Sequence, residues 1–228
     1  MRKLFRAIRR NEAETVERLV RGKPELVNCV ARQPPKKDDG QSPLQVALKS
    51  GTMDIAEYLM DMGADVNFIE DAASCCNAWR APVVHDAINC AVMSSRRSTD
   101  DELSGTRVFA TKEEADKALA VLERMIDCGA DVNARDSYGN SGLWRFCLQA
   151  QQILPRYNRT RHREEGSRRF TEELHEDLGR VLTVLRDAGA DVSYAPPGPG
   201  GAADPGRTVR ELHAEGPLSV LLAEVYGP

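Results

Sequence analysis

The sequence predicts an all-α solenoid, a fold in which similar helix pairs stack side by side in chain order. The string Gly-Ala-Asp-Val occurs three times, at 63–66, 129–132 and 189–192, which indicates an internal repeat. Each copy ends a stretch in which apolar residues recur at helical spacing, so the repeated unit is helical. The 228 residues are 41% apolar and 29% charged, a composition that can bury a continuous core.

Residues 36–70 show the predicted unit most clearly. Ser42 is placed to cap a first helix, Pro43 suits its first turn, and Gly51 ends it. A second helix with apolar residues at helical spacing follows, and Gly63 supplies the left-handed residue that ends it. The unit is therefore two short helices joined by a tight turn.

The order helix, tight turn, helix, Gly-Ala-Asp-Val-Asn and then Asp-x-x-Gly resembles the ankyrin repeat. The motifs that carry the resemblance are Ser42-Pro-Leu, Leu-x-x-Ala at 44–47, Gly51 and the string at 63–67. The resemblance covers nearly the whole chain. With its insertions between repeat helices, the chain is similar to single-domain ankyrin proteins of bacterial type. The resemblance implies a non-catalytic domain that binds a partner protein on a concave face. Inner helices and fingers, the loops between successive repeats, line that face in the family.

On this pattern the chain is one domain of about five repeats. Their predicted boundaries are about 1–35, 36–70, 71–134, 135–194 and 205–228. The first repeat is degenerate and has an arginine-rich outer face, as an end cap needs, and the last lacks the closing motif. Residues 195–206 have the composition of a flexible connector.

Two repeats are too long for a helix pair alone, and we expect insertions between their helices at about 92–111 and 151–171. The first of these repeats is long enough to count as two, but only one helix start, at 82–87, occurs in it. Thr111 and Glu114 then have the spacing of a capping box for the outer helix.

The two insertions are expected to lie together, because turns between inner and outer helices emerge at one end of an ankyrin stack. The first carries acidic residues at 100–102, and the second is rich in arginine. We therefore predict one composite lobe, with both helices of the fourth repeat lengthened into it. Two independent mobile loops are the alternative, since exposed ion pairs alone are too weak to order a long loop.

Charge and composition narrow the partner classes. A net charge of −4 and a pI of about 5.7 give no basic field for wrapping a polyanion, so nucleic acid is not the expected partner. Apolar runs are too short to span a membrane, and charges interrupt the N-terminal segment. Six sparse cysteines favour a reducing compartment. We expect a cytoplasmic monomer without disulfides.

No catalytic or metal motif is found. The sequence lacks a glycine-rich phosphate loop, His-Glu-x-x-His and a nucleophile elbow, so we expect no enzyme activity and no cofactor. His85 matches the family's helix-entry histidine, which implies a helix-start hydrogen bond, and the other three histidines are expected to be solvated. Cys75, Cys76, His85 and Cys90 are zinc-ligand types without ligand spacing, so packing is expected, with metal or redox roles as alternatives.

Five residues are the predicted partner-binding set: Trp79, Arg80, Tyr138, Trp144 and Arg145. Tryptophan, tyrosine and arginine dominate interface energies, and these residues fall on fingers and inner helices in the family's pattern. As alternatives, Trp144 packs against the preceding repeat and Trp79 clamps its own long finger. Four acidic residues at finger tips are expected to be solvated: Asp38, Asp39, Glu70 and Asp71.

A second function of a different class is binding of an anionic ligand, either nucleic acid or a phosphorylated molecule. The residues that would carry it belong to the second insertion: Arg156, Arg159, Arg161, Arg163, Arg168 and Arg169. Salt separates the two functions, because affinity for phosphate falls steeply as salt rises. Whether the protein inhibits, recruits or scaffolds its partner is left open; inhibition of an enzyme or toxin encoded beside it is one special case.

Overall fold

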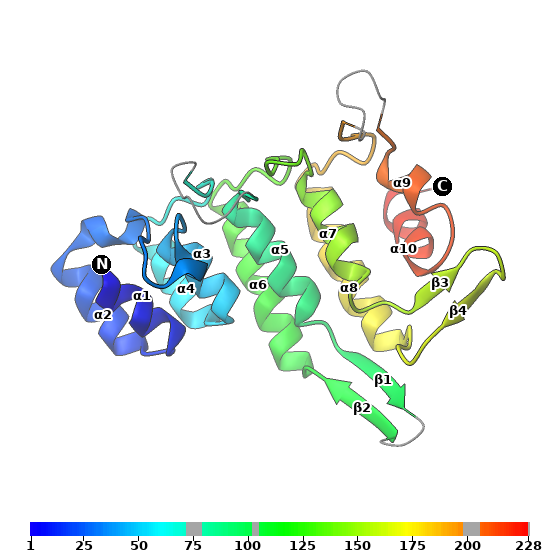
Figure 1. The fold of residues 1–228 in the computed structure, drawn as a ribbon, viewed down its shortest axis with the longest axis horizontal. Coiled ribbons are helices and arrows are strands. Elements are labelled where there is room, and N and C mark those ends of the chain that lie inside the picture. Colours follow the sequence, from blue (N-terminus) through cyan, green and yellow to red (C-terminus); the bar gives the residue numbers. More distant parts are fainter. Residues whose placement is uncertain (72–78, 102–104, 198–205, 228) are drawn as a thin grey trace.

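The structure is a computed structural model and describes residues 1–71, 79–101, 105–197 and 206–227. Within them the chain forms five successive helix pairs and two β-hairpins (Figure 1). The α-helices are α1 (Arg2–Arg9), α2 (Ala13–Gly22), α3 (Pro43–Ser50), α4 (Met53–Asp61), α5 (Val83–Met93), α6 (Lys112–Asp127), α7 (Gly142–Ala150), α8 (Glu172–Asp187), α9 (Val209–Leu212) and α10 (Pro217–Tyr226). Two 3-10 helices, Pro24–Asn28 and Lys36–Asp38, lie between α2 and α3.

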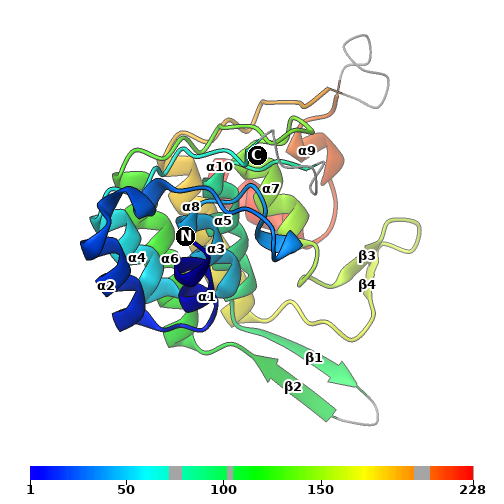
Figure 2. The same ribbon diagram turned by 60° about the vertical axis from the view of Figure 1, so that its left-hand side comes forward.

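The helix pairs stack in chain order, so the two ends of the chain lie at opposite ends of the molecule. Helices α1, α3, α5 and α7 form the inner layer, and α2, α4, α6 and α8 form the outer layer beside it (Figure 2). Apolar side chains from both layers make one core that runs through the stack. The mostly helical repeat architecture agrees with the sequence prediction.

Helix starts follow the predicted capping chemistry. The hydroxyl of Ser42 accepts the Gln45 N–H while the Gln45 side chain accepts the Ser42 N–H, and Thr111 and Glu114 form the same capping box. Helix α7 begins instead at Gly142, where a Cβ atom would lie 2.5 Å from the carbonyl oxygen of Val132. Only glycine allows this close approach between the helix and the loop before it.

Each residue of the Gly-Ala-Asp-Val-Asn string has a distinct role. In the first copy Gly63 takes a φ of +83° and ends α4, while Ala64 and Val66 are buried. Asp65 turns the loop by accepting the N–H of Asn67 at 2.9 Å. The string is therefore a helix stop followed by a rigid turn that points its last side chain toward the next repeat.

Asparagine at the end of the string joins successive loops by two hydrogen bonds. The Nδ2 of Asn67 donates to the Gly129 carbonyl at 2.9 Å, and its Oδ1 accepts the Asp131 N–H at 2.8 Å. The same two bonds join Asn28 to Gly63 and Asp65, and Asn133 to Gly189 and Asp191. In the last copy Ser193 replaces asparagine, and its hydroxyl bonds Asp191 within its own loop. The row of asparagine links ends there.

Two short β-hairpins interrupt the otherwise helical stack. Strands β1 (Arg97–Asp101) and β2 (Gly105–Phe109) pair antiparallel between α5 and α6, with Arg97 opposite Phe109. Strands β3 (Arg156–Asn158) and β4 (Arg163–Glu165) pair between α7 and α8. Neither segment was expected to form a strand, although Thr, Val and Phe in β2 are residues that favour strands.

The two segments meet, as their opposite charges predict. Arg169 Nε bonds the Asp100 carboxylate at 2.7 Å, and the Asp100 N–H bonds the Ser167 carbonyl at 2.7 Å. The chain at 167–169 thus runs antiparallel along the outer edge of β1. Val108 is 71% exposed and takes no part in docking.

The expected lengthening of both helices in the fourth repeat is half wrong. The outer helix α8 has 16 residues, like α6, whereas the inner helix α7 has only nine. After α7 the chain turns at once into the segment that leads to β3, and Ile153 and Leu154 anchor that turn in the core. The buried turn leaves no room for further helical residues.

We predict that Asn67→Ala lowers the free energy of unfolding by about 1–2 kcal/mol, because two exposed hydrogen bonds at about 0.5–1.5 kcal/mol each are lost. Urea unfolding followed by circular dichroism measures it. Ser193→Ala is the matched control, since Ser193 makes no such link to the next helix pair. Equal losses in the two variants would show that the inter-loop bonds do not stabilise the stack.

We also predict that trypsin cleaves slowly after Arg168 and Arg169 in the folded protein, because this chain segment is bonded to β1. Asp100→Ala, which removes the ion pair to Arg169, should speed cleavage about two- to fivefold, the range that an exposed pair allows. Asp61→Ala removes an exposed ion pair to Arg124 elsewhere and serves as control. Rapid cleavage of the unchanged protein at these bonds would contradict the docked arrangement.

Candidate functional site

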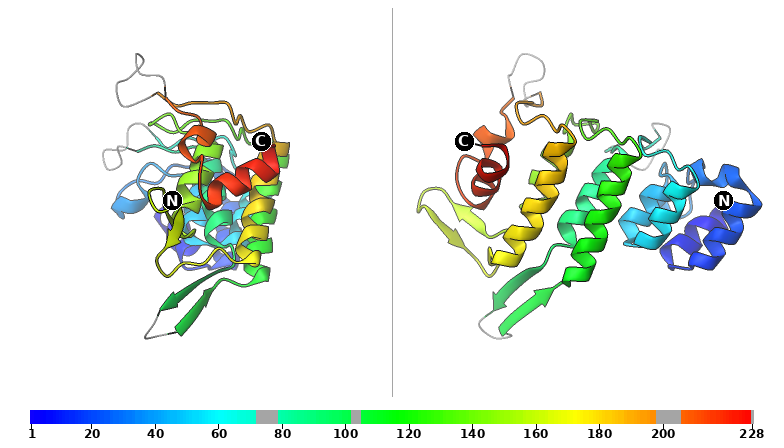
Figure 3. Two further views of the ribbon diagram at one scale, coloured as in Figure 1. Left: turned by 90° about the vertical axis from the view of Figure 1, so that its right-hand side faces the viewer. Right: turned by 180° about the vertical axis from the view of Figure 1, so that it is seen from behind.

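The fingers and the inner helices share one side of the molecule. The fingers are the loops 23–42, 62–82, 128–141 and 188–208, as bounded by the helices. Seen along the stack, the described parts of these loops, which leave out 72–78 and 198–205, project past the inner helices and away from the outer ones (Figure 3, left). Both hairpins leave the opposite end of the helices toward the same side. We call the surface formed by α3, α5, α7 and the fingers the concave face.

A charged network lies where α3, α5 and the finger 62–82 meet. Lys49 Nζ is 2.6 Å from a Glu70 oxygen and 3.8 Å from an Asp86 oxygen. Glu70 also accepts a hydrogen bond from Gln41 Nε2 at 3.1 Å and one from the Ala81 N–H. These contacts hold the finger against α3.

Asp86 is the most perturbed acid of this network. Its side chain is 3% exposed, and burial raises the pKa of its carboxyl to about 7, a shift that the charge of Lys49 opposes and that of Glu70 adds to. Gln45 Nε2 donates to Asp86 Oδ2 at 3.1 Å. The concave face thus contains a carboxyl group that titrates near neutral pH.

The expectation that the acidic finger tips are solvated is wrong for three of the four. Asp38, Asp39 and Glu70 are all buried. Asp38 pairs with Arg9 of α1, and Asp39 accepts hydrogen bonds from Gln33, so both close the first finger rather than project from it. The fourth acid, Asp71, is half-buried and pairs with Arg32 across the fingers.

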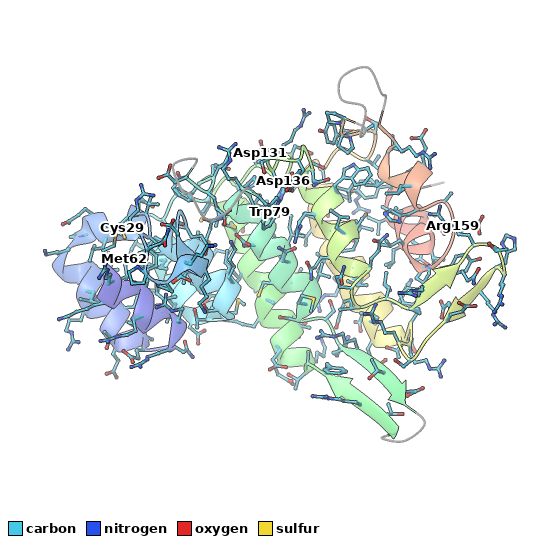
Figure 4. The ribbon with its side chains drawn as sticks, viewed as in Figure 1. Cys29, Met62, Trp79, Asp131, Asp136 and Arg159 are labelled. Carbon is cyan, nitrogen blue, oxygen red and sulfur yellow. The ribbon has the colours of Figure 1, made fainter. Side chains whose placement is uncertain are left out.

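Trp79 joins two fingers at the centre of the face. Its indole Nε1 donates to Asp136 Oδ2 at 2.9 Å (Figure 4), and the Arg145 guanidinium lies 4.8 Å from the centre of its rings. The Lys49 ammonium lies 6.0 Å from the same rings, within cation–π range. Trp79 is half-buried, so these contacts tie it to the next finger and leave part of the indole exposed. Clamping of its own finger stays a prediction.

Asp136 organises the finger that receives Trp79. Burial raises the pKa of Asp136, but hydrogen bonds from Trp79, Asn140 and the Tyr138 N–H outweigh it and hold the pKa below its ordinary value. The bonds turn the finger so that Tyr138, at its tip, is 66% exposed. The backbone of Arg80 contacts the same finger, since its N–H donates a hydrogen bond to the Ser137 hydroxyl at 3.0 Å.

Trp144 occupies a linking position rather than an exposed one. It is 7% exposed, and its Nε1 donates to the Tyr194 carbonyl of the next finger at 3.2 Å. At the matching position of α3, Gln45 Nε2 donates to the Ala81 carbonyl at 3.2 Å, and in α5 His85 Nε2 is 3.0 Å from the Ala134 carbonyl. Three different side chains, Gln45, His85 and Trp144, thus make the same bond from an inner helix to the next finger. A role for Trp144 in partner contact stays a prediction.

His85 therefore does not make the expected helix-start hydrogen bond. Its ring reaches the next finger, and burial lowers its pKa to about 4, so the imidazole is neutral. With Nε2 donating to the carbonyl, Nδ1 is left without a hydrogen-bond partner in the part of the chain that the structure describes. His85 acts as a link between repeats.

Comparison with protein-family models finds a match to the ankyrin repeat at residues 39–68. This segment contains α3, α4 and the first Gly-Ala-Asp-Val-Asn string. The chain contains an ankyrin repeat. No curated protein matches the sequence. Over the described residues, no helix has both the length and the apolar character needed to cross a membrane.

In the part of the chain that the structure describes, no group of three or more potential metal ligands comes together. Cys75 and Cys76 lie outside the described residues. Burial raises the pKa of Cys90 to about 11 and that of Cys147 to about 12, so both thiols stay protonated. His213, expected to be solvated, is buried against α7 instead.

The six arginines of the second insertion fall into two groups. Arg161 and Arg163 pair with Glu165 in the hairpin, and Arg169 pairs with Asp100. The other three line a pocket against the C-terminal helices: Arg156, Arg159 and Arg168.

Sequence reasoning missed Lys49, Asp86 and Asp136, which complete the polar part of the concave face. A signal for one of them was present. Asp86 follows His85, just as Arg145 follows Trp144, so the two occupy the same position in α5 and α7. Aligning the starts of these two helices would have placed Asp86 beside Arg145 on the concave face.

We predict that Asp86→Asn removes a pH dependence of stability. The folded protein holds the Asp86 proton up to about pH 7, whereas the unfolded chain releases it near its ordinary value of 3.8. Asp86 alone should therefore make the free energy of unfolding fall as pH rises between about 4 and about 7, whereas the buried His85 and His213, whose pKa is lowered to about 4, act in the opposite direction. In urea titrations across this range, the slope of the free energy of unfolding against pH should be more positive for Asp86→Asn than for the unchanged protein. In the control, Asp54→Asn on the exposed side of α4, the slope should be retained.

Proposed function

We propose that this ankyrin repeat protein binds a partner protein across its concave face and has no catalytic activity of its own. The five helix pairs are then five repeats with caps at both ends, and the hairpin segments are insertions between inner and outer helices. A monomeric, cytoplasmic adaptor that scaffolds or inhibits its partner fits this arrangement.

The observation that carries the proposal is the group around Trp79. A half-buried indole lies beside the Arg145 guanidinium, and the exposed Tyr138 ring stands on the neighbouring finger. Aromatic and arginine side chains held in place before binding lose little conformational entropy on contact, which makes them effective interface residues. The links from Asp136 to Trp79 and to the Tyr138 N–H supply that rigidity.

The charges of this face indicate the surface it fits. Lys49 and Arg145 flank Trp79, and the buried acids Glu70 and Asp86 offset them. The face is therefore close to neutral around its aromatic centre, so affinity should depend on desolvating Trp79 and Tyr138 more than on net charge. Such an interface changes little with salt, unlike phosphate binding.

We predict that Trp79→Ala and Tyr138→Ala each weaken partner binding by about 1–4 kcal/mol, the range for residues central to an interface. Partners captured from the native host and identified by mass spectrometry supply the ligand, and calorimetry with the purified partner measures affinity. Val220→Ala removes an exposed apolar side chain from α10, away from the face, and is the control.

Trp144→Ala separates the two roles of that residue. If it binds the partner normally but unfolds at lower urea, Trp144 is a link between repeats and leaves the binding set. Normal binding by both Trp79→Ala and Tyr138→Ala would end the concave-face proposal.

A further inference from the structure

A pocket of about 410 Å³ lies between the second insertion and the C-terminal helix pair, on the far side of α7 from Trp79. Four separate parts of the chain line it: the end of α7 with the turn that follows, strand β3 with its neighbours, Arg168 after β4, and the turn from α9 into α10. Its volume is within the range of small-ligand sites. Arg159 lies at this junction between the hairpin and the last two helices (Figure 4).

Three arginines give the pocket an excess of positive charge. Arg156, Arg159 and Arg168 line it, and none of them forms an ion pair with any residue that the structure describes. One acid, Glu215, also lines it and faces His162 at 3.2 Å. Three guanidinium groups against one carboxylate leave the pocket suited to a ligand that carries two negative charges.

Backbone carbonyls hold two of these arginines in position. Arg159 donates to the Leu212 carbonyl, and Arg168 donates from Nη1 to the Gln151 carbonyl at 3.2 Å and the Leu154 carbonyl at 3.4 Å. A neutral carbonyl fixes a guanidinium without cancelling its charge, so the remaining N–H groups are available to a ligand. The two side chains are ordered before anything binds.

His213 adds an unsatisfied polar group to the same wall. It is 5% exposed, and its Nδ1 lies 3.2 Å from the Gln151 amide nitrogen, which makes Nδ1 the acceptor and puts the proton on Nε2. That Nε2 has no partner among the residues described. Burial, with the charge of Arg159, lowers the pKa of His213 to about 4, so it is neutral and adds no charge of its own.

Apolar side chains complete the lining and indicate that the ligand has an organic part. Leu154, Pro155, Pro217 and Leu218 lie in the pocket wall beside the ring of Tyr157. Gly216 allows that ring to approach, since a Cβ atom there would lie 2.8 Å from Tyr157 Cγ. A free inorganic anion would leave these surfaces unused.

We propose that this pocket binds a small organic phosphate monoester, with its phosphate between Arg156, Arg159 and Arg168 and its organic part against Tyr157 and the proline-leucine wall. A phosphate monoester carries close to two negative charges at neutral pH, and guanidinium groups match its oxygens in geometry. The proposal does not rest on the concave-face function, and either can fail without the other.

Calorimetric titration of the full chain with phenyl phosphate tests it. One molecule should bind per chain, with benzenesulfonate, which has a similar shape but a single charge, at least about tenfold weaker, the effect of losing one charged contact. Inorganic phosphate should also bind more weakly than phenyl phosphate. Absence of binding at millimolar phenyl phosphate, or equal affinity for benzenesulfonate or inorganic phosphate, would overturn the proposal.

Arginine variants locate the site. Arg156→Gln, Arg159→Gln and Arg168→Gln should each raise the Kd for phenyl phosphate about tenfold or more. Arg163→Gln, which removes an exposed arginine of the same hairpin that pairs with Glu165, should change it less than about twofold. Equal weakening by Arg163→Gln would show diffuse charge attraction rather than a pocket.

Folding is checked by circular dichroism, because Arg159 and Arg168 also bond the backbone. Arg156 makes no side-chain hydrogen bond or ion pair within the described chain, so Arg156→Gln decides the outcome if the other two fail to fold. A single-stranded oligonucleotide is titrated in parallel. Tighter binding of the oligonucleotide, weakened equally by Arg156→Gln and Arg163→Gln, would replace the pocket by an extended nucleic-acid surface.

Discussion

The structure depends on contact between neighbouring repeats, because one helix pair cannot bury its apolar surface alone. Two rows of hydrogen bonds set that contact at fixed spacing. One row runs through asparagines at the closing strings, and the other through Gln45, His85 and Trp144 at the helix entries. In both rows a side chain of one repeat bonds the backbone of the next, so the register does not depend on the neighbour's side chains.

Because these hydrogen bonds are made to backbone groups, the exposed side chains of the concave face can differ in sequence without breaking them. An exposed side chain such as that of Tyr138 can be exchanged without removing any of these links. Asp136 both shapes its own finger and orients a side chain of the neighbouring finger. It turns its finger through backbone N–H groups and orients the Trp79 indole with the oxygen that remains.

Local chemistry explains what the sequence could predict. The Gly-Ala-Asp-Val-Asn strings and the capping boxes at Ser42 and Thr111 act within a few residues, and each helix boundary they imply is present. The hairpins escaped prediction because β1 gains its second partner from residues 167–169, far along the chain. Burial of Asp38 and His213 escaped for the same reason, since their partners Arg9 and Gln151 belong to other elements.

Serine in place of asparagine at 193 has a consequence for how the molecule opens. The last helix pair lacks the link that joins all earlier closing strings, and in a chain of nearest-neighbour couplings the weakest boundary opens first. Transient unfolding should therefore start at the C-terminal end and leave the preceding repeats intact. Amide hydrogen exchange would then be graded along the solenoid, fastest in α9 and α10 and slowest in its middle.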